Sequence, residues 1–226
     1  MNLLVKNGRV VDPARKLDSV TDVLIVDGKI RSIGKLANAD FPKFDATGLI
    51  VAPGFFDIHV HLREPGTEEA ETIATGGAAA VAGGFVAVAA MPNTKPSNDN
   101  PSITSYIISE ARRSSPALVF PIGAITKKQK GETLAEIGEM VEAGIIGISD
   151  DGKPVMDGRL FRRALEYAQL FDLPVIQHCE DLNLSQGGVM HEGATSARLG
   201  LKGIPAAAED TMVSRDLILA EVTGGK

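Results

Sequence analysis

The sequence has a single cysteine, Cys179, and no long apolar run. One cysteine excludes an internal disulfide framework and is typical of a protein in a reducing compartment. No apolar run approaches the ~20 residues that span a bilayer, and residues 1–8 lack the basic region and apolar core of a secretory signal. A formal net charge of −6 with scattered basic residues argues against a nucleic-acid-binding surface. We therefore expect a cytoplasmic, soluble protein that binds neither nucleic acid nor membrane.

Residues 1–52 have the pattern of a small β-sheet. Short apolar segments separated by turns predict strands, and Asp27-Gly28 between two of them is a strong hairpin signal. We expect an antiparallel sheet, too thin to hold a core alone. Its predicted strands are Leu3–Val5, Arg9–Val11, Val23–Val26, Ile30–Ile33 and Leu49–Val51.

From residue 53 on, nearly continuous apolar strands alternate with amphipathic helices. This alternation predicts an α/β fold with a parallel sheet covered by helices, either doubly wound or closed into a barrel. The predicted strands are Phe55–His61, Phe85–Met91, Ala117–Ala124, Ile145–Ser149 and Val175–His178. The predicted helices are Glu71–Ala82, Pro101–Arg113, Thr133–Glu142, Gly158–Phe171 and Ala206–Val222.

Polar residues near the strand ends favour the barrel. His59, His61, Asn93, Asp151 and His178 lie at or just after strand carboxyl ends, where a (β/α)8 barrel keeps its active site. No Gly-x-Gly-x-x-Gly follows the first strand, so a phosphate-binding turn is not expected. Residues 53–226 are thus predicted to be the amino-terminal part of a (β/α)8 barrel, with five of its strands.

Two histidines on one strand indicate a metal site. Side chains at i and i+2 of a strand point the same way, so His59 and His61 offer two imidazoles on one face. A single strand histidine is usually a core or surface residue, but burying two without partners costs several kcal/mol. Asp151 and His178 could join the pair around one or two zinc ions, which would acidify a bound water and polarise a carbonyl. Arg63 continues the alternation and would place a cation beside the metal.

The motifs resemble those of a known family. Residues 56–66, FDIHVHLREPG, are similar to the signature of type I dihydroorotases of the amidohydrolase superfamily. The resemblance continues in order through AGGF at 82–85, AMPNTKP at 90–96, SDDGKPV at 149–155, HCED at 178–181 and the segment 208–217. It implies a metal-dependent barrel with a small β-sandwich domain, to which residues 1–52 would contribute. It also implies interconversion of N-carbamoyl-L-aspartate and L-dihydroorotate in pyrimidine synthesis.

The resemblance also implies roles for individual residues. His59 and His61 match ligands of a first zinc ion, Asp151 a carboxylate that bridges two metals, and His178 a ligand of a second. His61, Arg63 and Asn93 match substrate-binding residues, the last two holding the substrate carboxylate. Since a guanidinium grips a carboxylate in a planar, two-pronged way, Arg63 favours an acidic substrate.

Two departures from the wider superfamily are visible. The fourth predicted strand has no lysine to carry a bridging carboxyl group, which fits the type I use of Asp151; Lys153 is the alternative. A further metal histidine and the catalytic Asp of the family's pattern would lie beyond Lys226, so the catalytic residue is unknown. We therefore expect an amino-terminal fragment with an incomplete barrel that is inactive and poorly soluble alone.

Two other functions are compatible with parts of the sequence. Another cyclic-amide hydrolase, for hydantoins, dihydropyrimidines or allantoin, is disfavoured by Arg63 and Asp151. A non-catalytic barrel that scaffolds aspartate transcarbamoylase is disfavoured because the metal histidines are present. The sequence leaves open a homodimer and an association with aspartate transcarbamoylase.

Several nearby residues are expected to play lesser roles. His191 lies in a glycine-rich loop and matches no ligand, and Cys179 is expected to be a small buried filler. Asp150 could support Asp151 or form a turn, and Asp57 could orient a histidine. Glu64 and Glu180 are interpreted as loop or supporting residues rather than acid–base catalysts.

Overall fold

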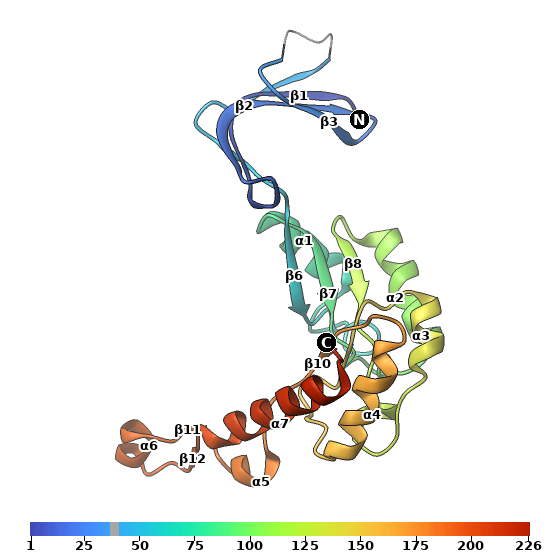
Figure 1. Ribbon diagram of the computed structural model, residues 1–226, viewed down its shortest axis with the longest axis vertical. Helices are drawn as coiled ribbons and strands as arrows, with labels where there is room; N and C mark the ends of the chain where they lie inside the picture. Colours follow the sequence, from blue (N-terminus) through green and yellow to red (C-terminus); the bar gives the residue numbers. More distant parts are fainter. Residues whose placement is uncertain (37–40) are drawn as a thin grey trace. The chain divides into compact units, whose positions relative to one another are not determined.

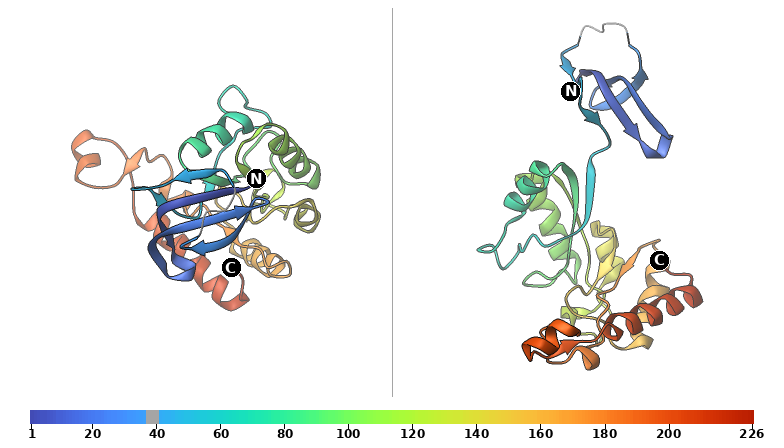
Figure 2. Two further views of the ribbon diagram at one scale, coloured as in Figure 1. Left: turned by 90° about the horizontal axis from the view of Figure 1, so that it is seen from above. Right: turned by 90° about the vertical axis from the view of Figure 1, so that its left-hand side faces the viewer.

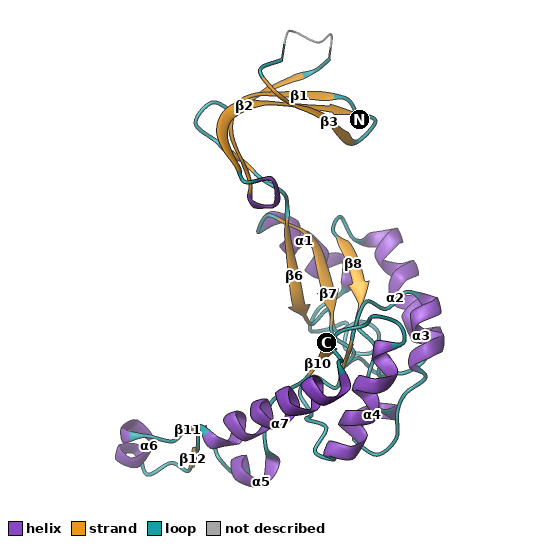
Figure 3. Cartoon of the chain, in the orientation of Figure 1, coloured by secondary structure: helices purple, strands orange, loops and turns teal. Residues whose placement is uncertain are grey.

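The computed structural model describes residues 1–36 and 41–226, which form two compact units, Met1–Gly54 and Phe55–Lys226 (Figure 1). Each unit is considered by itself. The first is a β-sheet with one 3-10 turn, and the second alternates strands with helices (Figure 3).

The first unit is a five-stranded sheet built on one long strand. Its strands are β1 (Leu3–Asp12), β2 (Leu17–Val26), β3 (Lys29–Gly34), β4 (Lys43–Asp45) and β5 (Ile50–Val51), with the turn η1 (Pro13–Arg15) after β1. The order is β3-β2-β1-β4, and β5 also pairs with β1. The predicted hairpin is confirmed, since β2 and β3 are antiparallel and Asp27 and Gly28 have φ values of 53° and 75°.

Two sequence predictions for this unit were wrong. The segments Leu3–Val5 and Arg9–Val11 belong to one continuous strand, β1, because a bulge between Val5 and Gly8 lets the pairing with β2 continue. The sheet is mixed rather than antiparallel, since β4 and β5 run parallel to β1. After β4 the chain passes through residues 46–49 and pairs with β1 again as β5, still parallel to it. The alternation of apolar residues could not predict this, because it does not depend on strand direction.

A buried carboxylate closes the bulge. Asp22 is 5% exposed, and it accepts hydrogen bonds from the Lys6 Nζ (2.6 Å), the Asn7 N–H (3.0 Å) and the Leu36 N–H (3.1 Å). The ammonium of Lys6, assisted by the two N–H groups, lowers the pKa of Asp22 from 3.8 to about 2. The charge thus satisfies the Asn7 N–H, which lies in the bulge, and the Leu36 N–H, which follows β3.

Five strands of the second unit, β6 to β10, lie as parallel neighbours in chain order. They are β6 (Phe55–Val60), β7 (Phe85–Ala90), β8 (Leu118–Pro121), β9 (Ile148–Ser149) and β10 (Val175–Ile176). The pairs β6–β7, β7–β8 and β9–β10 are parallel. Hydrogen bonds from Ile146 N to Pro121 O (3.1 Å) and from Ser149 N to Gly123 O (2.8 Å) join β8 to β9. The alternating α/β architecture is confirmed, and closure into a barrel stays a prediction.

Helices connect these strands and bury their apolar faces against them. They are α1 (Ile73–Ala82), α2 (Pro101–Ser114), α3 (Ile137–Ala143), α4 (Gly158–Gln169) and α7 (Ala207–Thr223). Side chains of Asn100 and Asp157 cap the N–H groups that begin α2 and α4. Val88 and Val119 pack with Ile73 and Ile107 beneath α1 and α2.

A second core lies between β9, α3 and α4. The stripe predicted for α4, Phe161, Ala164, Leu165 and Ala168, is buried. Ile137 and Met140 of α3 are fully buried against it, and Leu219 and Ala220 of α7 pack on the same cluster. The red helix α7 lies beside the orange helix α4 (Figure 2). This core holds the loops that follow β9 and β10.

The predicted helix Thr133–Glu142 begins late, at Ile137. The reason is a competing backbone pairing, because Ala135 N–H bonds to Ile125 O at 2.9 Å and Leu134 bridges to Thr126. Four short elements between residues 182 and 204 were not predicted: α5 (Leu182–Ser185), β11 (Met190–His191), α6 (Ala194–Leu199) and β12 (Gly203–Ile204). A 3-10 turn, η2 (Lys127–Gln129), was likewise not predicted.

Across the described residues, no helix has both the length and the apolar character needed to cross a membrane.

Asp22 makes the stability of the first unit depend on acid. Its lowered pKa contributes about 2 kcal/mol that is complete above pH ~4 and is lost as the pH falls toward 2. Asp22→Asn should therefore destabilise residues 1–54 at pH 7, and the difference from wild type should shrink by pH 2.5. Urea unfolding of the full chain, followed by NMR signals of this unit, measures both.

Asp18→Asn is the matched control, since Asp18 pairs with Arg9 on the surface, where both side chains are more than half exposed. It should change little at either pH. An equal loss in both variants would contradict the role of Asp22.

Candidate metal centre

Two imidazoles project from the end of β6. The ring centroids of His59 and His61 are 5.2 Å apart, as expected for residues two apart on a strand. Asp57, expected to orient a histidine, instead accepts a hydrogen bond from the backbone N–H of His59 (3.1 Å). It thus shapes the strand end rather than a ring.

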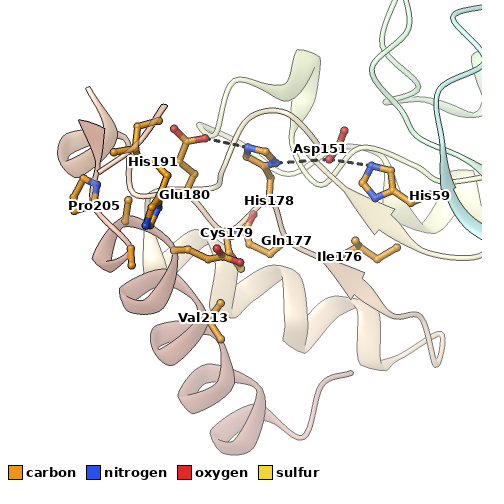
Figure 4. A pocket seen from close by; sticks show the side chains of 14 residues that line it. His59, Asp151, Ile176, Gln177, His178, Cys179, Glu180, His191, Pro205 and Val213 are labelled. Carbon is orange, nitrogen blue, oxygen red and sulfur yellow. Dashed lines mark hydrogen bonds and ion pairs between the residues drawn. The ribbon is translucent and has the colours of Figure 1, made fainter. Parts of the chain in front are cut away.

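The carboxylate of Asp151 lies between these imidazoles. Its Oδ1 is 3.3 Å from His59 Nε2, and its Oδ2 is 3.4 Å from His61 Nε2. His178, just after β10, turns its Nδ1 toward Asp151 Oδ1 at 3.8 Å (Figure 4). The structure therefore brings together all four residues predicted as metal ligands.

The spacing of these atoms fits a zinc ion. In a tetrahedral site with bonds of ~2.1 Å, neighbouring ligand atoms lie ~3.4 Å apart. One potential ligand atom from each of His59, His61 and Asp151 lies within 4.8 Å of the other two. Among the described residues, these three side chains form the group that could hold a metal ion, and we call it the metal group. Two imidazoles and a carboxylate are ligands that zinc accepts.

Asp151 is held by a buried polar scaffold. Its N–H donates to Ser149 Oγ (3.0 Å), and its carbonyl accepts from Gln129 Nε2 (3.4 Å). The neighbouring Asp150 is 1% exposed and accepts hydrogen bonds from Ile125 N (2.8 Å), Thr126 N (3.0 Å) and the Thr126 hydroxyl. Burial raises the pKa of Asp150, although these hydrogen bonds oppose the shift. The loop after β9 is thus tied to the end of β8.

Asn93 meets the metal group directly. It follows β7, and its Oδ1 is 2.9 Å from His61 Nδ1. Arg63 differs from Asn93, because its guanidinium has no hydrogen-bond or ion-pair partner in residues 1–36 and 41–226. Arg63 has a φ of 60°, and its carbonyl accepts from Thr67 N and Thr67 Oγ1, both at 3.0 Å.

The loops that carry Arg63 and Asn93 are locked together. Lys95 N donates to Pro65 O (2.8 Å), and a Cβ on Gly66 would overlap the Lys95 carbonyl oxygen. Glu64 accepts from Ile73 N (2.8 Å) at the start of α1 and from Tyr106 OH (3.1 Å) on α2. Glu64 is therefore a structural residue that fixes the loop.

The sequence of this chain matches a known protein family and several curated relatives. The family model described as dihydro-orotase-like matches residues 48–226. Curated dihydroorotases from Solibacter usitatus and Geotalea daltonii are 60% and 55% identical to the chain, over 100% and 99% of it. The match covers 53% of each, so the chain spans about half the length of these curated relatives.

The chain belongs to the dihydro-orotase-like family. The fold of this chain is similar to about half of the fold of solved hydantoinases. The L-hydantoinase from Arthrobacter aurescens superposes with a TM-score of 0.79 at 19% identity, over 99% of this chain and 51% of that one. A D-hydantoinase from Thermus sp. gives 0.73 at 25% identity, with the same coverage.

The other residues singled out in the sequence of this dihydro-orotase-like chain lie outside the metal group. A cavity of about 590 Å³ extends from His59 and Asp151 past His178 to His191. His191 is exposed and does not join the metal group. Cys179 is half-buried rather than buried and lines the cavity, where burial raises the pKa of its thiol. Lys153 is exposed.

Two residues that contact the predicted metal ligands could not be recognised fully from the sequence. Gln129 lies in the basic run 127–130 yet is only 5% exposed, with its amide against the Asp151 carbonyl. No local pattern distinguishes it from its lysine neighbours. Glu180 lies 3.2 Å from His178 Nε2, and a hydrogen bond from Ser185 lowers its pKa. The spacing of two residues from His178 was the available signal.

The cluster should bind zinc through its histidines. His59→Ala and His61→Ala should each weaken zinc affinity by more than about a hundredfold. Loss of a residue that only hydrogen-bonds a metal ligand typically costs about ten- to a hundredfold, and these variants remove a ligand itself. His191→Ala is the matched control and should leave the affinity unchanged. Calorimetric titration of the metal-stripped full chain measures all three, and an equal effect of His191→Ala would argue against this centre.

Gly66 should be irreplaceable in its loop. Its φ is 102°, and an added Cβ would lie 2.5 Å from the Lys95 Cβ. Gly66→Ala should lower the free energy of unfolding by about 2–4 kcal/mol. Gly131→Ala is the control, because Gly131 has a φ of 69° with nothing within 4 Å, so only backbone strain of about 1 kcal/mol is expected. Equal thermal stability of the two variants would show that the loops are not in contact.

Proposed function

We propose that this chain supplies the metal-binding and carboxylate-binding part of a zinc-dependent dihydroorotase. The reaction is the reversible closure of N-carbamoyl-L-aspartate to L-dihydroorotate with release of water. The observation that carries the proposal is the meeting of His59 and His61 on the carboxylate of Asp151, within a chain of the dihydro-orotase-like family. In this proposal β6–β10 are five strands of a (β/α)8 barrel, and residues 1–54 belong to a β-sandwich.

The chain's own residues divide the work between holding the metal and holding the substrate. His59, His61 and Asp151 would hold one zinc ion, and His178 would share Asp151 with a second. The chemistry that zinc supplies in such sites is polarisation of a carbonyl and acidification of a water molecule. Asp151 is the least exposed of the four, with 11% of its side chain accessible, so it orients the imidazoles from beneath.

Arg63 and Asn93 would bind the carboxylate that stays outside the ring of dihydroorotate. The guanidinium of Arg63 has no partner of its own within the described part of the chain, and its loop is fixed by Glu64 and Pro65. It is therefore free to make a two-pronged contact with a carboxylate. Asn93 gives its Oδ1 to His61, which leaves its amide N–H groups for the substrate.

A second candidate is a hydrolase of hydantoins or dihydropyrimidines, which the hydantoinase-like fold favours. These cyclic amides lack the carboxylate of dihydroorotate, so an unpaired guanidinium in the site would have no group to bind. The carboxylate preference therefore separates the two functions. Zinc binding separates both from a non-catalytic scaffold for aspartate transcarbamoylase.

Arg63→Lys should impair turnover of dihydroorotate selectively. The variant keeps the charge but loses the planar fork, so kcat/KM for dihydroorotate should fall about ten- to a hundredfold. Dihydrouracil, the same ring without the carboxylate, should be hydrolysed poorly by both proteins, with no such difference. Steady-state assays of the full-length gene product with both compounds measure this.

Lys95→Met provides the matched control, because it removes an exposed cation from the adjoining loop. It should change either rate less than threefold. A wild-type protein that prefers dihydrouracil would favour the second candidate and refute the role given to Arg63.

A further inference from the structure

Two imidazoles of the metal centre are each contacted on both nitrogens. His61 turns Nε2 to Asp151 Oδ2 (3.4 Å) and Nδ1 to Asn93 Oδ1 (2.9 Å). His178 does the reverse, with Nδ1 toward Asp151 Oδ1 (3.8 Å) and Nε2 at 3.2 Å from Glu180 Oε2 (Figure 4). The outer partner is an acceptor oxygen in both cases.

A neutral imidazole has one N–H and one lone pair, so its outer partner decides which nitrogen is left for a metal. Carboxylate and amide oxygens only accept, so the single proton belongs on the nitrogen with the closer acceptor. In both rings the outer contact is the shorter one, 2.9 Å to Asn93 against 3.4 Å to Asp151 for His61, and 3.2 Å to Glu180 against 3.8 Å to Asp151 for His178. We propose that Asn93 and Glu180 are positioning residues that fix opposite tautomers. His61 carries its proton on Nδ1 and presents Nε2, whereas His178 carries its proton on Nε2 and presents Nδ1.

Both positioning residues are themselves held in place. Glu180 accepts a hydrogen bond from Ser185, which is 6% exposed in α5. Asn93 lies in a turn where Pro92 O accepts from Thr94 N (2.9 Å) and Asn98 N (3.0 Å). Asn98 is fully buried and donates to Ile122 O at 2.8 Å. Each acceptor is thus anchored to the fold independently of the histidine that it contacts.

His59 offers a comparison within the same site. Its Nε2 faces Asp151, but over the described ranges its Nδ1 has no hydrogen-bond partner. The outer contacts therefore favour one tautomer for two of the three imidazoles around Asp151, His61 and His178. This deepens the proposed metal site, on which it rests, by naming the residues that prepare two of its ligands before metal binds.

The first test is tautomer assignment in the metal-free full chain by NMR of ¹⁵N-labelled histidine. The chain has four histidines, so the spectrum is simple, and His191→Gln identifies the signal of the histidine outside the metal group. The expected result is an Nδ1–H form for His61 and an Nε2–H form for His178. The same tautomer at both positions would overturn the proposal.

The second test measures zinc affinity in variants that remove or keep each acceptor. Glu180→Leu and Asn93→Leu should lose the assigned tautomer and weaken zinc binding about ten- to a hundredfold. Glu180→Gln and Asn93→Asp keep an acceptor oxygen and should restore both properties to within a few-fold. Glu209→Leu, which removes a carboxylate that lines the same cavity without contacting a histidine, is the matched control and should change neither.

The outcomes separate this inference from the proposed function. Wrong tautomers in a protein that still binds zinc would refute the positioning roles alone. The predicted tautomers in a protein that binds no zinc would refute the metal site and leave the assignment standing. An effect of Glu209→Leu equal to that of Glu180→Leu would show that charge in the cavity, rather than the contact with His178, sets the affinity.

Discussion

The carboxylate of Asp151 is the group on which the candidate site depends, because imidazoles from two separate strands meet only there. His59 and His61 arrive from β6 and His178 from β10, and each turns one ring nitrogen to this carboxylate. A carboxylate with only 11% of its side chain accessible is tolerated only when its hydrogen bonds and counter-charges are in place. A metal ion among the imidazoles would supply the positive charge, and it would join His59 to His178, which are 119 residues apart in the chain.

Around this group lies a layer of polar contacts that sets its geometry. Asp150 and Gln129 tie the loop after β9 to the segments that follow β8, so Asp151 is fixed from its backbone. Asn93 and Glu180 contact the imidazoles from outside, and Glu64 anchors the loop of Arg63. The guanidinium of Arg63, for which we propose substrate binding, has no hydrogen-bond or ion-pair partner within the described residues, and an acidic substrate would supply one.

Much of this could be predicted from the sequence, and the rest depends on contacts that no local pattern records. The alternation in β6 places two imidazoles on one face, and strand ends place Asp151 and His178 at one edge of a parallel sheet. The parallel pairing of β4 with β1 could not be predicted, because apolar alternation carries no direction. Burial of Gln129 among lysines, and the contact of Asn93 with His61, arise only when loops from different strands pack together.

X-ray absorption of the zinc-loaded protein would identify the groups that bind the metal, because it reports the number and type of atoms around zinc. Cys179 lies next to His178 in the chain and lines the same cavity, so sulfur is the competing ligand. The account predicts nitrogen and oxygen neighbours alone at about 2.0–2.2 Å, with the outer-shell signature of at least two imidazoles. A zinc–sulfur distance of about 2.3 Å, or a shell without imidazole, would contradict it.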